Sequence, residues 1–195
     1  IGLGALGFGE MTAEHFSMAE RHIYETAPAD HPLFLLLADI AARHGVPVDI
    51  HMEAIPADLA KPAHLRSSRN PDIFKANMAA FERLLGHNRK ADIIWSHAGW
   101  DNTGQRTPAL IRELLGRHAN LYMSLKIGRD SMPGTRPIQR GMGLKDSWRK
   151  LISDFSDRFL IGSDQFHVTP RADRRFPHHH TPSRILLNRL SPDVA

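Results

Sequence analysis

Short apolar runs bounded by turn residues alternate along the chain with longer stretches in which apolar residues recur at helical spacing. A short run that is apolar throughout is typical of a strand buried in a sheet. Such runs predict strands at residues 4–9, 46–52, 93–96, 121–127 and 159–162. The amphipathic stretches predict helices at residues 33–44, 71–85, 108–118 and 147–155. Gly45 and Gly86 stand where the first two helices would end, as helix C-caps do.

This alternation of strand and helix predicts an α/β fold with a parallel sheet. A (β/α)8 TIM barrel and a doubly wound sheet both show this alternation of strand and helix. A barrel needs eight strands, typically in about 250 residues. The five predicted strands would therefore form an incomplete barrel, with strands 4–8 present and strands 1–3 missing. No shift in composition divides the chain, so we expect residues 1–195 to form one partial barrel domain.

Composition narrows the chemistry that the chain can perform. Its 195 residues are 42% hydrophobic and 24% charged, as in an ordinary globular domain. There is no cysteine, so disulfides, thiolate metal sites and a cysteine nucleophile are excluded. No apolar run approaches the ~20 residues of a membrane span. The formal net charge is +4, and without a recognition-helix or aromatic-interleaved pattern it does not predict a nucleic-acid partner.

Polar side chains that can bind metal stand where four of the predicted strands end. They are Glu10, His51, His97 and Asp164. The carboxyl ends of parallel strands form the ligand-binding edge of α/β folds, so these residues would meet there. Alternation also puts Asp49, His51 and Glu53 on one face, and a buried strand does not carry three polar groups on one side without a use.

Each of these residues also has an ordinary structural alternative. His51 could be hydrogen-bonded in a core, His97 could face solvent at a strand end, and Asp164 could cap the segment that follows it. If all three alternatives held, three unrelated structural roles would have to fall at the same edge of the sheet. One shared site accounts for their common position more simply.

Three segments in this order resemble the amidohydrolase-related (amidohydrolase 2) family of metal-dependent TIM-barrel enzymes. They are VDIHMEA, IIWSHAGW and RFLIGSDQF. In that family the fifth strand ends in a His, the sixth in a His within an HxG-like turn, and the eighth in an Asp within a GSD-like turn. His51, His97 and Asp164 match these positions, and residues 121–127 stand where the seventh strand should lie.

The resemblance implies a site and a reaction. His51 and Asp164 would bind a divalent ion, Asp164 would also accept a proton from water, and His97 would be a catalytic acid or electrostatic group. Related barrels carry a bridging Glu or modified Lys at the fourth strand, which adds Glu10 as a metal candidate. Zinc is the expected ion, with manganese or iron as alternatives. The implied activity is hydrolysis of a small lactone, ester or amide by a metal-activated water; the alternative is non-oxidative decarboxylation.

Basic residues near the seventh strand suggest that the small-molecule substrate is carboxylated. Lys126 and Arg129 could bind a carboxylate, helped by Arg136 and Arg140 in the loop that follows. Taken singly, each arginine is more readily a solvated loop charge. The loop 169–182 contains three consecutive histidines, which could bind a second metal or simply line a mobile loop.

The family's first strand carries an HxH metal pair that does not occur here. The chain also begins at Ile1 inside an apolar run, without an initiator Met. We therefore expect upstream coding sequence that supplies the pair, and we expect the 195-residue chain alone to be inactive. No targeting signal is visible, and a cytoplasmic location is only the default. A homo-oligomer is left open.

Two other classes of protein have weaker support. Residues 2–7 (GLGALG) satisfy GxGxxG, but only Ile1 precedes them. A dinucleotide-binding fold also requires an acidic residue about 20 positions on, at the end of the next strand. Glu25 is at about that distance, but the next predicted strand begins only near Val46. A serine hydrolase lacks support because there is no GxSxG. A non-catalytic barrel stays open, and metal content would separate it from an enzyme.

Overall fold

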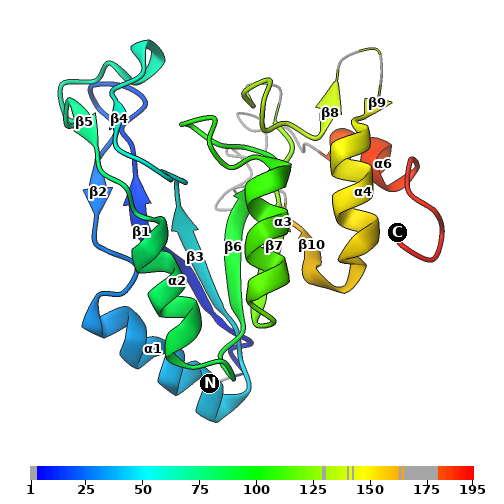
Figure 1. Ribbon diagram of the computed structural model, residues 1–195, viewed down its shortest axis with the longest axis horizontal. Coiled ribbons are helices and arrows are strands. Elements are labelled where there is room, and N and C mark those ends of the chain that lie inside the picture. Colours follow the sequence, from blue (N-terminus) through cyan, green and yellow to red (C-terminus); the bar gives the residue numbers. More distant parts are fainter. Residues whose placement is uncertain (1–3, 129–130, 140, 142, 163, 165–179) are drawn as a thin grey trace.

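The computed structural model describes residues 4–128, 131–139, 141, 143–162, 164 and 180–195. Its centre is a six-stranded sheet in the order β10-β7-β6-β3-β1-β2 (Figure 1). The parallel strands are β1 (Phe8–His15), β3 (Val48–Met52), β6 (Ile93–Ala98), β7 (Leu121–Leu125) and β10 (Phe159–Ile161). The short β2 (Glu25–Thr26) pairs antiparallel with β1. The predicted α/β class with a parallel sheet is confirmed.

The parallel strands follow their sequence order across the sheet. A doubly wound sheet reverses direction at an internal strand, and no reversal occurs among the strands of the described residues. The sheet is open, with β2 and β10 at its edges, so the described part of the chain does not form a closed barrel. All five parallel strands present their carboxyl ends at one edge, which is the upper edge in Figure 1.

Helices connect the parallel strands. They are α1 (Pro32–His44), α2 (Met78–His87), α3 (Pro108–Arg117) and α4 (Asp146–Asp154), and α6 (His180–Leu187) follows nearer the C-terminus. In Figure 1, α2 and α3 lie in front of the sheet. The start of α1 is capped by His31, whose Nδ1 accepts from the Leu33 amide at 3.2 Å, and its end is set by Gly45 at φ 61°. The left-handed conformation there is one that glycine adopts without strain.

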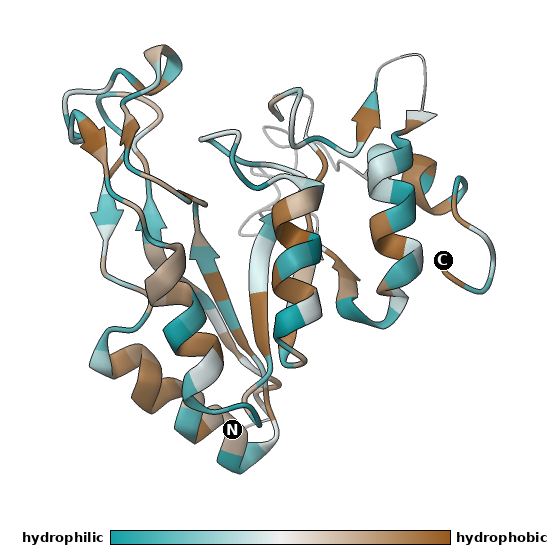
Figure 2. Ribbon diagram, viewed as in Figure 1, coloured by the Kyte–Doolittle hydropathy of each residue, from teal (hydrophilic) through white to brown (hydrophobic). Residues whose placement is uncertain are grey.

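The hydrophobic core lies between the helices and one face of the sheet. Val48, Ile50 and Met52 alternate along β3 with Asp49 and His51, and each of the three apolar residues is at most 2% exposed. They belong to one apolar cluster with side chains of α2 and α3. Figure 2 shows the alternation along β3. Burial of each such side chain stabilises the folded state by about 1.5–3 kcal/mol. The apolar face of β3 therefore packs against the helices, and Asp49 and His51 lie on the opposite face of the sheet.

Two elements differ from the sequence-based expectation. The apolar run predicts a strand at residues 4–9 that ends before Glu10, but β1 begins at Phe8 and continues through Glu10 to His15. Polar residues in the second half of β1 interrupt the apolar pattern, so that part of the strand was not predicted. The second helix begins at Met78 rather than near residue 71, because β5 (Ile73–Phe74) pairs antiparallel with β4 (Leu59–Ala60).

A second, smaller apolar cluster supports the carboxyl edge. It consists of Phe16, Ile55, Leu65 and Phe74. The rings of Phe16 and Phe74 stack with their centroids 3.8 Å apart. Leu65 ends the short helix η1 (Ala63–Leu65). The cluster anchors the segment directly after β1, which carries Met18 and His22 towards the site.

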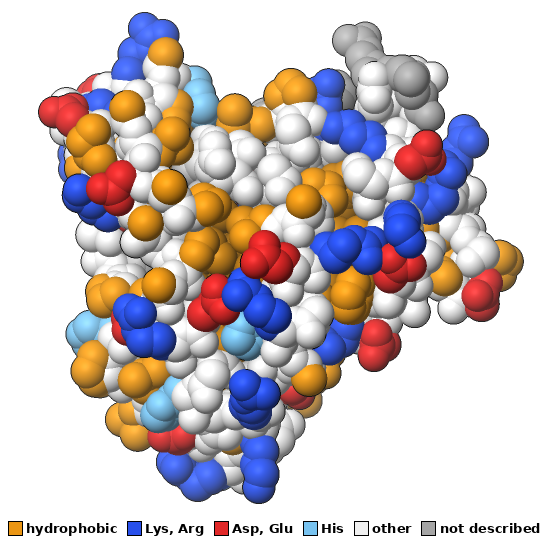
Figure 3. All heavy atoms as spheres, in the orientation of Figure 1, with side chains coloured by type: hydrophobic (Ala, Val, Ile, Leu, Met, Phe, Trp, Pro, Cys, Tyr) orange, Lys and Arg blue, Asp and Glu red, His pale blue; other side chains and the backbone are white. Residues whose placement is uncertain are grey.

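Charged residues on the helix-covered face are interspersed in sign, as Figure 3 shows. Arg112 of α3 pairs with Asp154 of α4 at 2.6 Å, and Arg117 of α3 pairs with Glu82 of α2 at 3.0 Å. Such exposed pairs contribute about 0–1 kcal/mol each. The remaining short elements are the antiparallel pair β8 (Ile138–Gln139) and β9 (Gly143–Leu144) and the helix η2 (Ser156–Arg158). Within the described residues, no helix has the length and apolarity that a membrane crossing requires.

Candidate active site

A pocket of about 310 Å³ opens at the carboxyl edge of the sheet. Five of the six residues predicted from the sequence line it together, although they come from five different strands or the loops that follow them. The sixth, Arg129, lies outside the described residues, as does Arg140. The lining residues are Glu10, Thr12, His15, Met18, His22, His51, His97, Trp100, Lys126 and Asp164.

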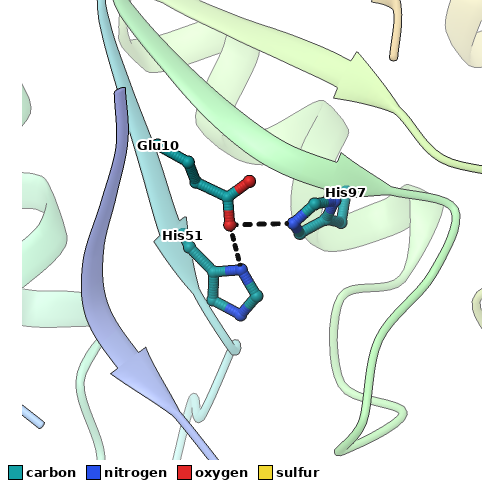
Figure 4. Close-up of side chains that lie close together, drawn as sticks. All are labelled: Glu10, His51 and His97. Atoms are coloured by element: carbon teal, nitrogen blue, oxygen red, sulfur yellow. Dashed lines mark hydrogen bonds and ion pairs between the residues drawn. The ribbon is translucent and has the colours of Figure 1, made fainter. Parts of the chain in front are cut away.

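Glu10 joins two of the predicted histidines through one oxygen atom. Its Oε1 accepts from His51 Nδ1 at 2.6 Å and from His97 Nε2 at 3.0 Å, as Figure 4 shows. Burial opposes the charge of this carboxylate, but the two imidazoles outweigh burial and hold the pKa of Glu10 well below its usual range. For His97, burial is the larger influence and lowers its pKa.

The other ring nitrogen of His51 meets a second group. His51 Nε2 lies 2.9 Å from His15 Nδ1 and 3.4 Å from Glu53 Oε2. Burial opposes a charge on His51, but Glu10 and Glu53 on its two sides raise its pKa to about 9. Burial likewise opposes the charge of Glu53, yet His15 and His51 keep the pKa of Glu53 well below its usual range. The two carboxylates thus hold a positive charge at His51.

Two site residues have backbones in the left-handed region. Among the described residues, His97 at φ 64° and Asp164 at φ 49° are the non-glycine residues with positive φ. At His97 the pairing of β6 with β7 shifts register between Trp95 and Ala98, which re-aims the side chain. Strained conformations of this kind cost about 1–3 kcal/mol and cluster at functional sites. The strain supports a functional role for both residues.

Gly99, directly after β6, makes room beside His97. Its φ is 92°, and a Cβ atom there would lie 2.7 Å from Pro137 Cγ. A larger residue would therefore push against the loop that contains Pro137. The small Ala-Gly pair after the histidine is a structural requirement of this turn.

Asp164 carries an ion pair rather than a contact with the histidines. Its Oδ2 accepts from Lys126 Nζ at 2.6 Å. The ammonium group of Lys126 also lies 3.7 Å from the centroid of the Trp100 ring, a cation–π contact. Asp164 faces the same pocket as Glu10, His51 and His97, with its charge balanced by lysine.

A buried arginine ties together the two strands that carry His51 and His97. Arg106 is 2% exposed, and its guanidinium donates to the carbonyl oxygens of Met52 and Ser96. The same group stacks on Trp95, with Cζ 4.4 Å from the ring centroid. Because these carbonyls stand next to site residues in the chain, Arg106 fixes the spacing of the strand ends.

Sequence-based reasoning missed several residues that the structure brings to the site. His15 and Glu53 contact His51 directly, and Trp100 and His22 line the pocket. For Glu53 the signal was present, since it shares a face with His51 by alternation. His15 was hidden because the strand before it was predicted to end at residue 9.

Comparison with known proteins gives one family. The family model described as Amidohydrolase matches residues 14–190, most of the chain. The match includes His15, His51, His97 and Asp164 and begins after Glu10. No curated protein and no solved structure matches the chain significantly.

Proposed function

Because the chain belongs to the amidohydrolase family, we propose that it is a metal-dependent hydrolase whose pocket acts on a small lactone, ester or amide. The observation that carries this proposal is the convergence of four histidines and two carboxylates on one pocket. The histidines are His15, His22, His51 and His97, and the carboxylates are Glu10 and Asp164. A third carboxylate, Glu53, lies against His51. A volume of about 310 Å³ suits a small molecule.

The donor atoms present fit a divalent cation. Two sets, Glu10–His51–His97 and His15–His51–Glu53, each have their ligand atoms within 4.8 Å of one another. Imidazole and carboxylate together suit zinc first, with manganese or iron as alternatives. His51 belongs to both sets and is the ligand that we propose most directly; Asp164, which lines the same pocket, could add a further oxygen. When bound, a divalent ion supplies the Lewis acidity that lets water lose a proton near pH 7.

The chain's own residues would divide the proton chemistry. Asp164 carries a carboxylate that Lys126 keeps in place, so Oδ1 is available to accept a proton from the attacking water. His97 Nε2 donates to Glu10, so it presents an N–H that could instead donate a hydrogen bond to the oxygen on which negative charge develops. Trp100 lies next to His97, with ring centroids 6.2 Å apart, and next to the ammonium of Lys126.

Non-oxidative decarboxylation is the second candidate. The ammonium of Lys126 lies inside the pocket and could also hold a substrate carboxylate, which is the group that a decarboxylase removes. The two reactions differ in their products, since only the decarboxylase releases carbon dioxide.

The strand order supports a segment of a (β/α)8 barrel as the architecture. In such a barrel each parallel strand pairs with the next one in sequence, and catalytic residues stand at the carboxyl ends of several strands. The five parallel strands obey this order, and Glu53, His97 and Lys126 stand within or directly after three of them. A single domain built on this segment follows from the same continuity.

The first prediction tests this proposal by metal content and turnover. We expect the chain to bind at least one divalent first-row ion, measured by elemental analysis after exchange dialysis. In any preparation that turns over substrate, a chelator should remove activity and added zinc should restore it. Asp164→Asn should lower kcat by at least 10²-fold, within the usual contribution of a proton-transfer group, with unchanged circular dichroism.

His97→Ala should lower kcat by a larger factor than it lowers the amount of ion bound per chain. Arg43→Ala, an exposed change on α1, is a suitable control that should alter neither quantity. Absence of any bound ion, together with activity that a chelator does not touch, would refute the proposed function.

A further inference from the structure

Donor atoms of three side chains converge on the Nε2 side of the His51 ring. His15 Nδ1 lies 2.9 Å from His51 Nε2 and 3.4 Å from Glu53 Oε1, and His51 Nε2 lies 3.4 Å from Glu53 Oε2. The donors come from the carboxyl end of β1, from β3 and from the residue after β3. They therefore stand on two neighbouring strands whose spacing the sheet fixes.

The two separations of 3.4 Å from Glu53 match the edges of a metal coordination shell, whereas the 2.9 Å between the two imidazoles is the length of a hydrogen bond. Nitrogen and oxygen ligands at 2.0–2.1 Å from a tetrahedral ion lie about 3.3–3.4 Å from one another. The separations around Glu10 Oε1 are 2.6 and 3.0 Å instead, which are ordinary lengths for charge-assisted hydrogen bonds. Glu10 therefore behaves as a hydrogen-bond acceptor, and Glu53 stands at ligand spacing from both His15 and His51.

One carboxylate oxygen in this set has no hydrogen bond. Glu53 is 1% exposed, and its Oε1 accepts from Asn102 Nδ2 at 2.6 Å. Its Oε2 has no hydrogen-bond partner among the described residues, although it points towards His51 Nε2. An unsatisfied buried carboxylate oxygen destabilises the fold, and a cation between it and the two imidazoles would remove that cost.

Each of the three donors also has an outer partner that orients it. Glu10 accepts from His51 Nδ1, Asn102 donates to Glu53, and His22 Nε2 lies 3.4 Å from His15 Nε2. Metal-binding histidines almost always donate their other ring N–H to a carboxylate, carbonyl or water. As a metal ligand His51 would lose one proton and keep a single free lone pair, and its hydrogen bond from Nδ1 to Glu10 would place that lone pair on Nε2, on the His15 side.

We propose that the divalent cation of this chain is held by His15, His51 and Glu53, with Glu10 as the carboxylate that orients His51. Three protein ligands are the number that catalytic zinc sites use. The inference rests on the proposed function only in assuming that the chain binds such an ion. It gives Glu10 a different role from the ligand role predicted from the sequence.

The test is zinc binding by titration calorimetry on the 195-residue chain after treatment with chelator, repeated with Co²⁺ and read by its visible absorption. The variants are His15→Ala, Glu53→Gln, Glu10→Gln and, as a matched control on the exposed end of α1, His44→Ala. We expect His15→Ala and Glu53→Gln each to weaken zinc more than 100-fold and to change the Co²⁺ spectrum. Glu10→Gln should weaken zinc by only about 10–100-fold, as the loss of an orienting partner does.

The order of the losses decides the assignment. If Glu10→Gln removes the ion while His15→Ala and Glu53→Gln bind like the parent chain, the ion lies on the other side of His51 and the inference is wrong. If the parent chain binds neither zinc nor Co²⁺, the proposed function itself fails. Circular dichroism checks that each variant is folded. If His15→Ala is not folded, His15→Gln replaces it.

Discussion

At the scale of single residues, His51 is distinguished by having different neighbours on its two ring nitrogens. Glu10 and His97 lie on the Nδ1 side, and His15 and Glu53 lie on the Nε2 side. A single imidazole thus links residues of β1, β3 and β6. Its position at the end of a buried strand is what made it predictable from the sequence.

Lys126 has a more specific role than the anion clamp that the sequence suggested. Its ammonium is shared between Asp164 and the Trp100 ring. We expect Lys126→Met to lower kcat about 10-fold or more for acidic and neutral substrates alike, because the Asp164 carboxylate loses the partner that orients it. Steady-state kinetics with a matched pair of substrates measures this.

A rise in KM confined to the acidic substrate would add a direct contact between Lys126 and the substrate carboxylate. An unchanged kcat for both substrates would remove the orienting role. Lys150→Met on α4, also a salt-bridged lysine but remote from the pocket, serves as the control.

At the scale of elements, the site depends on how closely β1 approaches β3. The register between these strands shifts twice, between Phe8 and Met11 and between Thr12 and Glu14. A Cβ atom on Gly9 would lie 2.5 Å from Asp49 Cβ, which is closer than two non-bonded carbon atoms can lie. The glycine therefore allows β1 to lie against β3 where Glu10 reaches His51.

Gly9→Ala should accordingly lower the free energy of unfolding by about 1–3 kcal/mol, the usual cost of overpacking. It should also weaken metal binding, because β1 would be displaced. Gly86→Ala is the matched control: Gly86 lies in α2 with nothing within 4 Å of its added Cβ, so we expect a gain of about 0.5–1 kcal/mol. Urea denaturation of both variants measures the difference, and equal behaviour would contradict the packing argument.

The helices and strands could be predicted where their apolar residues follow a single helical or strand period. The apolar faces of β3, β6, β7 and α3 are continuous, and their bounds were predicted to within a few residues. The second half of β1 could not be predicted, because Glu10, Thr12 and Glu14 are polar, and Glu10 and Thr12 line the pocket rather than the core. The same cause hid His15. The pairing of β4 with β5 depends on a tertiary contact around Phe74 that local sequence does not encode.

At the scale of the whole molecule, the sheet is open in the described part of the chain. β10 pairs with β7 on one side and with no described strand on the other. Leu160 and Ile161 in this edge strand are 44% and 47% exposed. An edge strand that exposes apolar residues is a template for pairing with another chain.

We therefore expect the chain to self-associate through β10 at micromolar concentration. Leu160→Lys combined with Ile161→Lys should weaken the association at least 10-fold in sedimentation velocity. Leu33→Lys, on the exposed side of α1, is the control and should leave association unchanged. A parent chain that sediments as a monomer throughout, or a control that is as effective as the β10 variant, would exclude this edge as the contact.

The order of the parallel strands also has a consequence for how the molecule is made. Each parallel strand after β1 pairs with the parallel strand that precedes it in the chain. During synthesis, which proceeds at about 5–20 residues per second, every newly emerging parallel strand finds its partner already translated. No parallel strand has to be inserted between two neighbours that are already hydrogen-bonded, so the sheet can grow at one edge from the ribosome outward.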